Sequence, residues 1–239
     1  SLSGLADACI DSFEFLPWDT TVPGLSPAVH LTSEDLASFL SSDWLNDEMI
    51  NGGVDWILQR AGPGSRSRIL NCLFIQSLRN ARSQSVSYSP QKFSPINKAI
   101  RAGTVNLVWF PLLVSGNHWT LLKIDLVQKT IAYSDSLRLT RLLEELALVQ
   151  WWLKTLLRSS DDFDIVEPDF PSPRQLDSHS CGIIALSILA SILLEFSPLW
   201  SPECAATEQI EWFLRLSSMF EDGDDFVSFF FIASAYYMN

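Results

Sequence analysis

The stretch that constrains the fold most reads CGIIALSILASILL and covers residues 181–194. Such a run is typical of a helix, and a helix that is hydrophobic on most of its sides is buried. The run is shorter than the roughly 18 residues that a membrane span requires. We therefore expect a helix that begins at Cys181 and lies inside a globular domain.

Three segments upstream of this run have the length and pattern of β-strands. Residues 105–114 are densely apolar, whereas residues 119–126 and 130–133 alternate in part between apolar and polar side chains. We predict that these three strands are neighbours in one sheet. A further strand is expected at residues 163–166.

Helices are expected before and after these strands. Thr32 and Asp35 have the spacing of a capping box, which predicts a short helix after Thr32. Asn46 is placed to cap a second helix, whose apolar residues at helical spacing are Ile50, Val54, Ile57 and Leu58. Residues 138–158 carry leucines at helical spacing over a length that can cover a sheet face, and residues 208–219 predict a last helix.

Two segments depart from this regular pattern. Residues 1–30 contain three prolines, which interrupt helices, so we expect an irregular segment that lies across the body of the domain. Gly52 and Gly53 fall inside the predicted second helix, where each costs about 1 kcal/mol relative to Ala. This cost indicates that another element packs closely against them.

The expected elements define an α+β domain, with helices before and after a central sheet. The chain has 239 residues, of which 47% are hydrophobic, and this is enough for one compact domain. We expect a single domain over residues 1–239. Within it, 31–194 carry the motifs described below, 1–30 form an N-terminal extension and 195–239 complete the domain. No secretory signal is recognisable at the start of the sequence.

Composition limits the classes of function. The four cysteines, Cys9, Cys72, Cys181 and Cys204, show no CxxC spacing, which argues against a zinc site and a disulfide framework. We therefore expect no metal, and a reducing compartment, the nucleus or the cytoplasm. The formal net charge of −12 argues against nonspecific nucleic-acid binding, because a polyanion is repelled on average. A monomer without a membrane association is the expected state.

The charges are segregated along the chain. From Trp56 to Ile124 there is no Asp or Glu, although nine basic residues occur there, so all 28 acidic residues lie elsewhere. Two interpretations are open. The segregation can serve a protein partner with its own patterned charge, or it can form two oppositely charged faces that attract one another within the fold.

Candidate catalytic groups gather around Cys181. A thiol at a helix N-terminus lies at the positive end of the helix dipole, which favours the nucleophilic thiolate. Gly182 leaves room for backbone or substrate to approach. Gln175 precedes the cysteine in a loop, from which its amide can turn back and donate to a developing oxyanion together with the Cys181 backbone N–H.

A base and its partner are expected at the rim of the sheet. His118 lies between two predicted strands, where a side chain can reach a cleft, and Asp135 follows the strand at 130–133. If these strands are hairpin neighbours, the Asp135 carboxylate can orient the His118 imidazole and stabilise its charged form. Asp125 is a rival, but it lies on the strand that follows His118, where residues at odd spacing face opposite sides.

Five sequence blocks, taken together, resemble a known family. They are Trp44-Leu45-Asn46-Asp47, Asn117-His118-Trp119, Ile124-Asp125-Leu126, Tyr133-Ser134-Asp135-Ser136-Leu137, and the stretch from Gln175 to Cys181-Gly182. In order and approximate spacing they resemble the SUMO-specific protease family of Ulp/SENP type, which are cysteine proteases with a papain-like fold. The resemblance covers roughly residues 31–194.

The resemblance implies a fold and a site. The fold is α+β and papain-like, with a central mixed sheet flanked by helices and a buried helix led by the catalytic cysteine. The implied triad is His118, Asp135 and Cys181, with Gln175 in the oxyanion hole and no cofactor. Residues Trp44, Trp119 and Asp47 are implied to line a narrow tunnel for the substrate's di-glycine. Flat indole walls placed close together exclude side chains and admit backbone alone.

The implied reaction is cleavage after the C-terminal Gly-Gly of SUMO or a related ubiquitin-like protein, whose conjugates would be the partners. Two alternatives stay open. The same fold can act on ubiquitin or another modifier, and the chain can be a weak or inactive module that binds a ubiquitin-like protein. The second alternative is prompted by Ser180, where the family usually has Asp, and by Gly52 and Gly53, where bulky residues are expected.

The other cysteines and histidines have simpler interpretations. Cys9, Cys72 and Cys204 are expected to be packing or surface thiols, His30 a turn residue and His179 a loop residue. A metal pair of His179 with Cys181 is a minor alternative.

Overall fold

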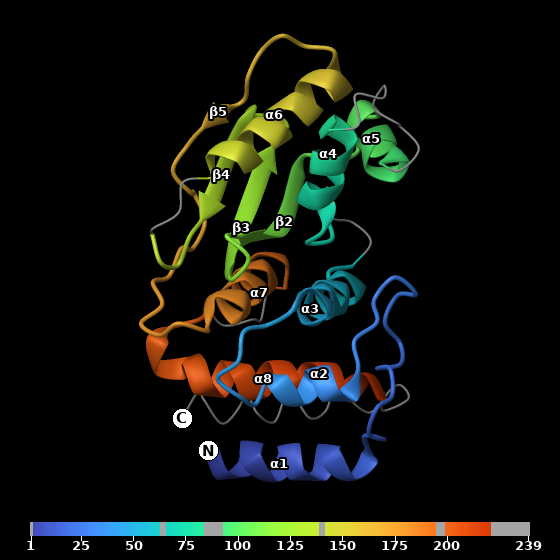
Figure 1. Cartoon of the computed structure of the whole chain (residues 1–239), viewed down its shortest axis with the longest axis vertical. Coiled ribbons are helices and arrows are strands. Elements are labelled where there is room, and N and C mark those ends of the chain that lie inside the picture. The colour runs from blue at the N-terminus through green and yellow to red at the C-terminus, as the bar shows by residue number, and fades with distance from the viewer. Residues whose placement is uncertain (1, 63–65, 84–92, 139–141, 195–198, 221–239) are drawn as a thin grey trace.

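A five-stranded sheet forms the centre of the molecule, in the order β1-β2-β3-β4-β5 (Figure 1). The structure is a computed structural model that describes residues 2–62, 66–83, 93–138, 142–194 and 199–220. The strands are β1 Ser67–Ile69, β2 Leu107–Val114, β3 His118–Asp125, β4 Thr130–Ser134 and β5 Asp164–Ile165. β3 pairs antiparallel with both β2 and β4. At the two edges of the sheet, β1 pairs parallel with β2, and β5 pairs parallel with β4. The sheet is mixed, and the three central strands are neighbours as predicted.

The two faces of the sheet bury different side chains, because successive strand residues point to opposite sides. Trp109, Trp119 and Leu121 belong to one hydrophobic cluster, and Phe110 and Leu122 belong to the other. The first cluster includes residues of α3 (Asp47–Arg60) and α7 (Cys181–Leu193). The second cluster includes residues of α4 (Phe74–Ser83), α5 (Ser94–Arg101) and α6 (Leu143–Leu157).

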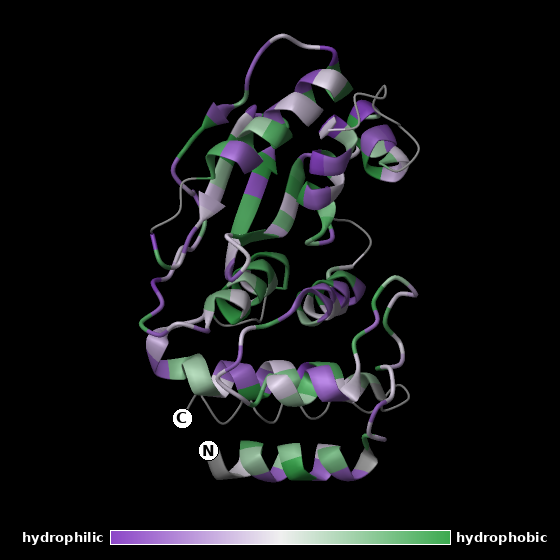
Figure 2. Cartoon of the chain, viewed as in Figure 1, coloured by the Kyte–Doolittle hydropathy of each residue, from purple (hydrophilic) through white to green (hydrophobic). Residues whose placement is uncertain are grey.

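Helix α7 is the predicted apolar helix. All its residues from 181 to 190 are buried, and Figure 2 shows it as largely hydrophobic. In Figure 1 it lies between the sheet and a layer formed by α2 (Ser33–Ser38) and α8 (Ala205–Ser217). The prediction of a buried helix led by Cys181, and with it the papain-like α+β fold, is confirmed.

Both predicted N-caps are present. The Thr32 hydroxyl accepts the Asp35 N–H at 3.1 Å, and the Asp35 carboxylate accepts the Thr32 N–H at 3.0 Å. The Asn46 side chain accepts the Met49 N–H at 2.9 Å and begins α3. Leu58 was predicted on the apolar face of α3, but it is 42% exposed, because it lies at the margin of the buried stripe.

Gly52 and Gly53 allow the close packing that their helical position predicted. A Cβ at Gly53 would lie 2.6 Å from Leu186 Cδ1 of α7, and a Cβ at Gly52 would lie 2.8 Å from Leu31 Cδ2. Leu31 and Leu186 are both fully buried. The two glycines therefore let α3 approach these leucines, which offsets their poor helix propensity.

The N-terminal segment corrects one prediction. Residues Leu2–Phe15 form helix α1 rather than an irregular chain, because the prolines of this region all lie beyond it. Cys9 is buried, and the Phe13 ring lies 5.1 Å from the Phe213 ring of α8. The segment does lie across the body of the domain, since α1 runs alongside α8 (Figure 1).

Element boundaries differ from the sequence predictions by a few residues. α6 begins at Leu143 instead of 138, and α8 covers Ala205–Ser217, followed by a short 3-10 helix, Ser218–Phe220. Residues 80–95 are rich in Ser and other polar residues, which predicts a surface loop. This stretch overlaps the end of α4 and the start of α5 and otherwise falls mostly on 84–92, outside the described residues. The aromatic tail at 226–237 also lies outside them. Among the described residues, none of the helices combines the length and the hydrophobicity that a membrane span requires.

Candidate active site

The predicted nucleophile begins the buried helix. Cys181 is the first residue of α7 and is 2% exposed. Its side chain borders a small internal space that is also lined by Trp119 of β3 and by Ser136 after β4. The thiol therefore lies at the positive end of the α7 dipole, next to the strands that carry the predicted base and its partner.

His118 and Asp135 meet at one end of the β3–β4 hairpin. His118 begins β3, Asp135 follows β4, and both are 7% exposed. The His118 Nε2 and Asp135 Oδ1 atoms lie 2.7 Å apart. The Leu137 backbone N–H donates to the same Oδ1 at 2.9 Å and fixes the carboxylate. Asp125 ends β3 at the far end, where its Oδ1 accepts two backbone N–H groups of a turn.

The surroundings of His118 favour its charged form. Burial lowers the pKa of the imidazole, but hydrogen bonds to Asp135 and Cys181, with the negative charges of these two groups, outweigh burial and raise the pKa to about 9. The imidazole therefore interacts with both a carboxylate, at 2.7 Å, and the Cys181 sulfur. Thiol proteases use an ion pair of a cysteine thiolate and a histidine imidazolium, and a charged His118 would be the cation of that pair.

Two other cysteines have surroundings that keep them protonated. Burial raises the pKa of Cys72 to about 12, and the charges of Asp47 and Glu48 add to this effect. Burial also raises the pKa of Cys9. The Cys204 sulfur accepts the Ser201 backbone N–H at 3.1 Å, within a short turn. These contacts fit the expected packing roles.

Gln175 is buried beside the nucleophile loop. Its Oε1 accepts the Ser136 hydroxyl at 2.5 Å, and its Nε2 donates to the Asp177 carbonyl oxygen at 2.9 Å. A Gln side-chain nitrogen carries two protons, so a second one remains for a developing oxyanion. Ser136 was not singled out in the sequence, because it meets Gln175 only across 39 residues of chain.

The turn that leads into Cys181 is organised by Asp177, which the sequence analysis also did not single out. The Asp177 carboxylate accepts the backbone N–H groups of His179 at 2.9 Å and Ser180 at 2.7 Å. It also accepts the Ser180 hydroxyl at 2.7 Å. Hydrogen bonds from Ser180 and His179 outweigh burial and lower the pKa of Asp177. The loop before Cys181 therefore has a carboxylate at 177, whereas the family resemblance would place one at 180.

The sequence contains one signal for this turn. An Asp whose side chain accepts N–H groups two and three residues later forms an Asx-turn, a common preference of this residue type. His179 lies 3.7 Å from the Asp177 carboxylate. Within the described residues, no group of three or more His, Cys, Asp or Glu side chains could hold a metal ion.

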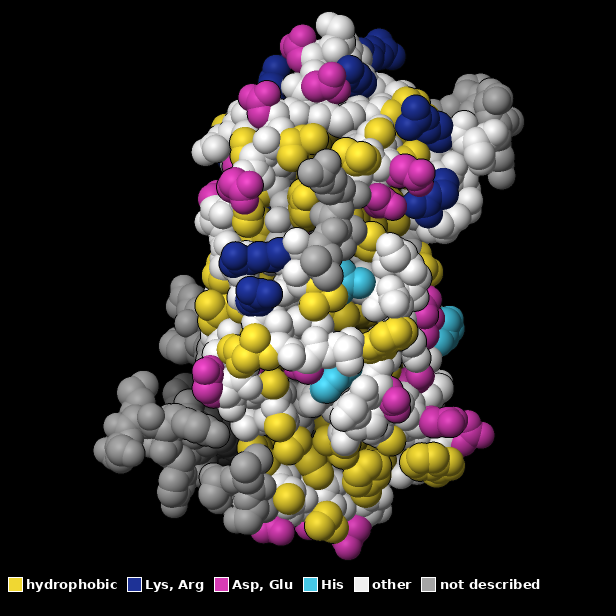
Figure 3. Space-filling view, turned by 60° about the vertical axis from the view of Figure 1, so that its left-hand side comes forward, with side chains coloured by type: hydrophobic (Ala, Val, Ile, Leu, Met, Phe, Trp, Pro, Cys, Tyr) yellow, Lys and Arg dark blue, Asp and Glu magenta, His cyan; other side chains and the backbone are white. Residues whose placement is uncertain are grey.

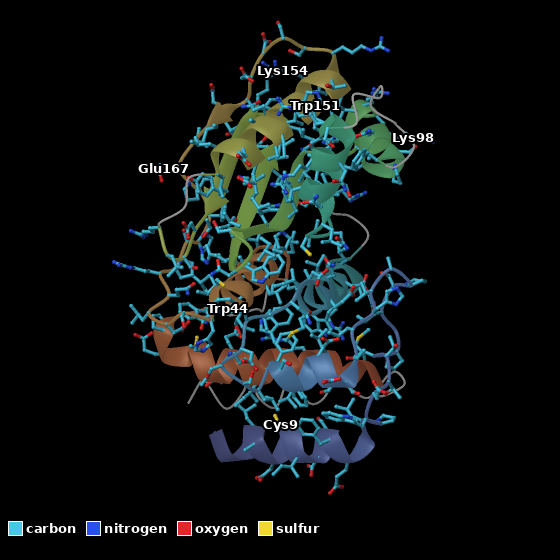
Figure 4. All side chains as sticks on the ribbon, in the orientation of Figure 1. Cys9, Trp44, Lys98, Trp151, Lys154 and Glu167 are labelled. Atoms are coloured by element: carbon cyan, nitrogen blue, oxygen red, sulfur yellow. The ribbon has the colours of Figure 1, made fainter. Side chains whose placement is uncertain are left out.

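The Trp44-Leu45 segment joins the two halves of the site. The Trp44 indole N–H donates to the Ser178 carbonyl oxygen at 2.6 Å, and the Trp119 indole N–H donates to the Leu45 carbonyl oxygen at 2.7 Å. Trp44 is labelled in Figure 4. The Leu45 side chain lies 3.0 Å from where a Gly182 Cβ would be. Gly182 was expected to admit backbone or substrate, but the group that approaches it is Leu45.

The residues implied to line the tunnel differ in exposure. Trp44 is 51% exposed and Trp119 is 2% exposed. Asp47 begins α3, and its carbonyl oxygen lies 3.8 Å from the Cys72 sulfur. The two indoles thus flank the Leu45 segment next to Cys181, and their substrate role and that of Asp47 remain predictions.

A thiol at the start of a buried helix, an imidazole on the adjacent sheet and a carboxylate behind it, on a papain-like fold, define the class of thiol proteases. A comparison with protein families narrows this class. The family described as Ulp1 protease family, C-terminal catalytic domain, matches residues 43–198, which is more than half of the chain. The chain belongs to the Ulp1 protease family.

Similar proteins agree with this family. Sentrin-specific protease 3 from Homo sapiens is 27% identical over 141 residues, covering 58% of this chain and 23% of that protein. Ubiquitin-like-specific protease 1 from Saccharomyces cerevisiae is 27% identical over 161 residues, covering 65% and 24%. The chain thus spans about a quarter of the length of the curated relatives it matches.

Solved structures share the fold. The SUMO protease Ulp1 with its catalytic cysteine oxidised to a sulfinic acid aligns with a TM-score of 0.67 at 21% identity, over 90% of this chain and 96% of that chain. The Ulp1 protease domain in complex with Smt3, the yeast ortholog of SUMO, gives 0.67 at 21%, over 88% and 93%. At this identity the likeness concerns the fold.

Proposed function

We propose that this chain is a cysteine protease that cleaves after the C-terminal Gly-Gly of SUMO or a related ubiquitin-like protein, as an isopeptidase and as an endopeptidase. The observation that carries the proposal is the 2.7 Å contact of His118 Nε2 with the Asp135 carboxylate, on an imidazole whose pKa is raised by both Asp135 and the Cys181 sulfur. Membership of the Ulp1 protease family supports it, as do relatives whose names refer to sentrin and to ubiquitin-like proteins.

The first half of the reaction forms a thioester. The Cys181 thiolate attacks the carbonyl carbon of the terminal glycine, which forms a C–S bond and turns the carbonyl oxygen into an oxyanion. The Gln175 amide and the Cys181 backbone N–H donate to that oxyanion. When the intermediate collapses, the C–N bond breaks and His118 gives its proton to the leaving lysine amine.

The second half releases the modifier. Neutral His118 takes a proton from water, whose oxygen attacks the thioester carbon and forms the carboxylic acid of the terminal glycine. The C–S bond breaks, and Cys181 leaves as a thiolate beside the imidazolium. Asp135 holds the ring orientation throughout, through its 2.7 Å contact with Nε2.

In the proposed substrate slot, Trp44 and Trp119 act as walls around an extended Gly-Gly backbone, with Asp47 at the margin. The contacts of both indoles with the segments around Leu45 and Ser178 support this role, because they hold the rings next to the nucleophile loop. Selectivity for one modifier would come from contacts outside this slot.

The structure weakens the reasons for an inactive binding module. Gly52 and Gly53 are explained by their packing against Leu31 and Leu186. Ser180 is explained by its hydrogen bond to the Asp177 carboxylate. Neither substitution disturbs the contacts of His118.

The decisive experiment is a panel of ubiquitin-like proteins with electrophilic C-termini, incubated with the chain at neutral pH under reducing conditions. We expect a covalent adduct with SUMO that maps to Cys181 by mass spectrometry, and weaker or no labelling by the ubiquitin probe. Absence of an adduct with every member would refute protease activity. Adducts with ubiquitin alone would change the substrate to ubiquitin.

The Cys181→Ser variant separates the enzyme from a binding module. For an enzyme, cleavage of a SUMO conjugate is lost, while binding of SUMO measured by calorimetry persists. Retained cleavage by this variant would remove Cys181 from the proposed mechanism.

We further propose that residues 1–239 act as one domain and as a monomer, in the nucleus or cytoplasm. Four free cysteines fit a reducing compartment. Helix α1, from the proposed extension, and α8, from the proposed C-terminal part, pack together on the same hydrophobic cluster as α7, which supports one domain.

A further inference from the structure

An open groove lies between α6 and the edge strand β5, away from Cys181, His118 and Asp135. Its volume is about 680 Å³, and its apolar lining includes Leu143, Trp151, Phe163 and Ile165. Leu143 is 71% exposed and Ile165 is 56% exposed. Figure 4 labels Trp151 and Lys154 on the α6 side of this region. Two large aliphatic side chains therefore stand in solvent beside a hollow.

β5 presents an open backbone edge next to this groove. The Asp164 N–H donates to the Lys129 carbonyl oxygen at 2.9 Å, and the Val166 N–H donates to the Ile131 carbonyl oxygen at 3.0 Å. Because the N–H and C=O of one residue point to the same side of a strand and the next residue points the opposite way, those of Ile165 face away from β4. An exposed edge of this kind is a template for another strand.

The groove and the edge form one surface. The Phe163 backbone is fixed to α6 by hydrogen bonds of 2.6 and 2.9 Å with the Gln150 side chain. A strand added beside Ile165 would continue the sheet outward, and every second side chain of it would point over α6. Its alternate residues would then fill the hollow beside Leu143 and Ala147.

This edge is acidic. Residues 159–173 contain five acidic residues and no Lys or Arg. Asp161, Asp162 and Asp169 are paired with Lys129, Lys154 and Lys123, respectively. Asp164 and Glu167 are exposed, and no ion pair involves them among the described residues. Figure 3, which brings this side forward, shows acidic and apolar side chains near one another over the upper half.

We propose that β5 and the α6 groove bind an extended segment of a partner protein by strand addition. The segment carries apolar side chains at alternate positions, which enter the groove, and Lys or Arg at its flanks, which face Asp164 and Glu167. Residues 166–174 lead from this edge to Gln175, and Figure 1 shows them running down one side of the molecule. A bound partner is thus held on the side from which the nucleophile loop is built.

This surface is independent of the proposed proteolysis, so the test uses binding to the full chain. The probe is a fluorescein-labelled synthetic peptide of alternating Val and Thr with two Lys at each end, and the comparison peptide has Glu in place of Lys. We expect saturable binding of the Lys peptide below about 1 mM in fluorescence anisotropy. The Glu peptide is expected to bind at least about tenfold more weakly.

Two α6 variants locate the site. Ala147 is exposed and lines the groove, so Ala147→Trp fills the hollow and is expected to weaken peptide binding by about tenfold or more. Glu144 is exposed on the same helix but does not line the groove, so Glu144→Trp is the matched control and is expected to leave binding unchanged. Equal effects of the two variants would overturn the proposal.

A charge exchange guards against a folding defect. The double variant Asp164→Lys with Glu167→Lys is expected to weaken the Lys peptide and to strengthen the Glu peptide, a reversal that an unfolded chain cannot produce. Loss of binding to both peptides would contradict the assigned contacts of the peptide's flanking charges with residues 164 and 167.

Amide hydrogen exchange tests the strand pairing itself. On binding, exchange at Ile165 is expected to slow, because its N–H gains a partner, whereas Val166 is expected to change little because it already bonds Ile131. Unchanged exchange at Ile165 at saturating peptide, or no saturable binding of either peptide, would overturn strand addition.

Discussion

Among single residues, Asp135 controls the charge of His118. Replacing it by Asn removes the charge and the ionic hydrogen bond that offset burial, so the pKa of His118 is expected to fall from about 9 by about 1 to 3 pH units. The chain has only three histidines, so an NMR titration of the ring protons can follow each one. Asp125→Asn is the control, since Asp125 caps a turn at the other end of β3. An unchanged titration of His118 in Asp135→Asn would show that the contact does not set its charge.

Asp177 holds the turn from which Cys181 projects. Asp177→Ala removes the acceptor of three hydrogen bonds, and at about 1.5 to 3 kcal/mol for hydrogen bonds to a charged group we expect kcat/KM to fall roughly 10- to 100-fold. Asp177→Asn keeps an oxygen acceptor for the two backbone N–H groups, so a much smaller loss is expected. Hydrolysis of a SUMO C-terminal fluorogenic substrate measures both. Urea unfolding of each variant shows whether a loss of rate merely reflects a loss of folded protein.

A double variant tests whether one carboxylate at this turn is required and whether its position can be exchanged. Ser180→Asp alone places a second carboxylate where the Ser180 hydroxyl lies 2.7 Å from Asp177, so repulsion is expected to lower kcat/KM. The double variant that combines it with Asp177→Asn has a carboxylate at 180 and an amide at 177, which can form a hydrogen bond. Most of the activity is therefore expected to return. Additive losses in the double variant would mean that the two side chains do not act as a pair.

At this scale the sequence predicted residues that stand in recognisable patterns. Cys181 was predicted from its place at a helix start, and His118 and Asp135 from their places at strand ends and from the order of the five blocks. Their catalytic roles remain predictions. Asp177 was missed although its contacts are with residues two and three positions later and are typical of an Asx-turn. Ser136 was missed because its contact is not local in the sequence. Ser136 reaches Gln175 only after the sheet brings the two segments together.

Among the elements, the contact of α3 with α7 is the most sensitive to a small change. Gly53→Ala improves helix propensity by about 1 kcal/mol, but its Cβ would lie 2.6 Å from Leu186 Cδ1 and 2.8 Å from Cδ2. Because two branches of a fully buried leucine are affected, rotation of that side chain cannot relieve both contacts. We expect a net destabilisation of about 1 to 3 kcal/mol in urea unfolding.

The Leu186→Ala background provides the control for this prediction. Removing the leucine branches creates the space that the new methyl group needs, so Gly53→Ala is expected to cost less there than in the parent chain. An equal cost in both backgrounds would place the strain elsewhere than at the contact with Leu186.

Elements with a clear apolar period were predicted well, and those defined by context were not. The run at 181–194 and the caps Thr32 and Asn46 predicted α7, α2 and α3. Helix α1 was missed because prolines later in the segment dominated its interpretation, while its apolar residues find their partners only on α8. The strand expected at 163–166 is confirmed as β5, Asp164–Ile165, but its parallel pairing with β4 depends on the tertiary arrangement and was not predicted.

For the whole molecule, the segregated charges have a partial explanation within the fold. Lys123 and Arg79, from the stretch without acidic residues, pair with Asp169 and Glu145 from outside it. Lys123 contacts both oxygens of Asp169 at 2.7 Å and lies next to Trp109. Two ion pairs therefore join the basic stretch to acidic residues elsewhere in the chain. At β5, the acidic residues Asp164 and Glu167 remain exposed to solvent.

The site also couples its proton to the unfolding of the whole chain. His118 binds its proton with a pKa of about 9 in the folded protein and of about 6.5 as the ordinary value in an unfolded chain. Between these pH values the folded state carries more protons, so its contribution to stability is complete below about pH 6.5 and is lost as pH rises through about 9. We expect this contribution to be on the order of 3 kcal/mol.

Urea unfolding at several pH values between about 6 and 9.5 measures this linkage when the chain is compared with its His118→Gln variant. Other groups titrate in both proteins, so the informative quantity is the difference between their unfolding free energies. As pH rises, the unfolding free energy of the parent chain is expected to fall relative to that of the variant by the stated amount. The reason is that the glutamine side chain of the variant has no proton to lose. Because the Cys181 sulfur also raises the pKa of His118, the Cys181→Ser background should show a smaller shift, since Asp135 alone then stabilises the charge. If the unfolding free energies of the parent chain and His118→Gln changed equally with pH, the proton on His118 would not be bound more tightly in the folded state. The ion pair on which the proposed mechanism depends would then lose its support.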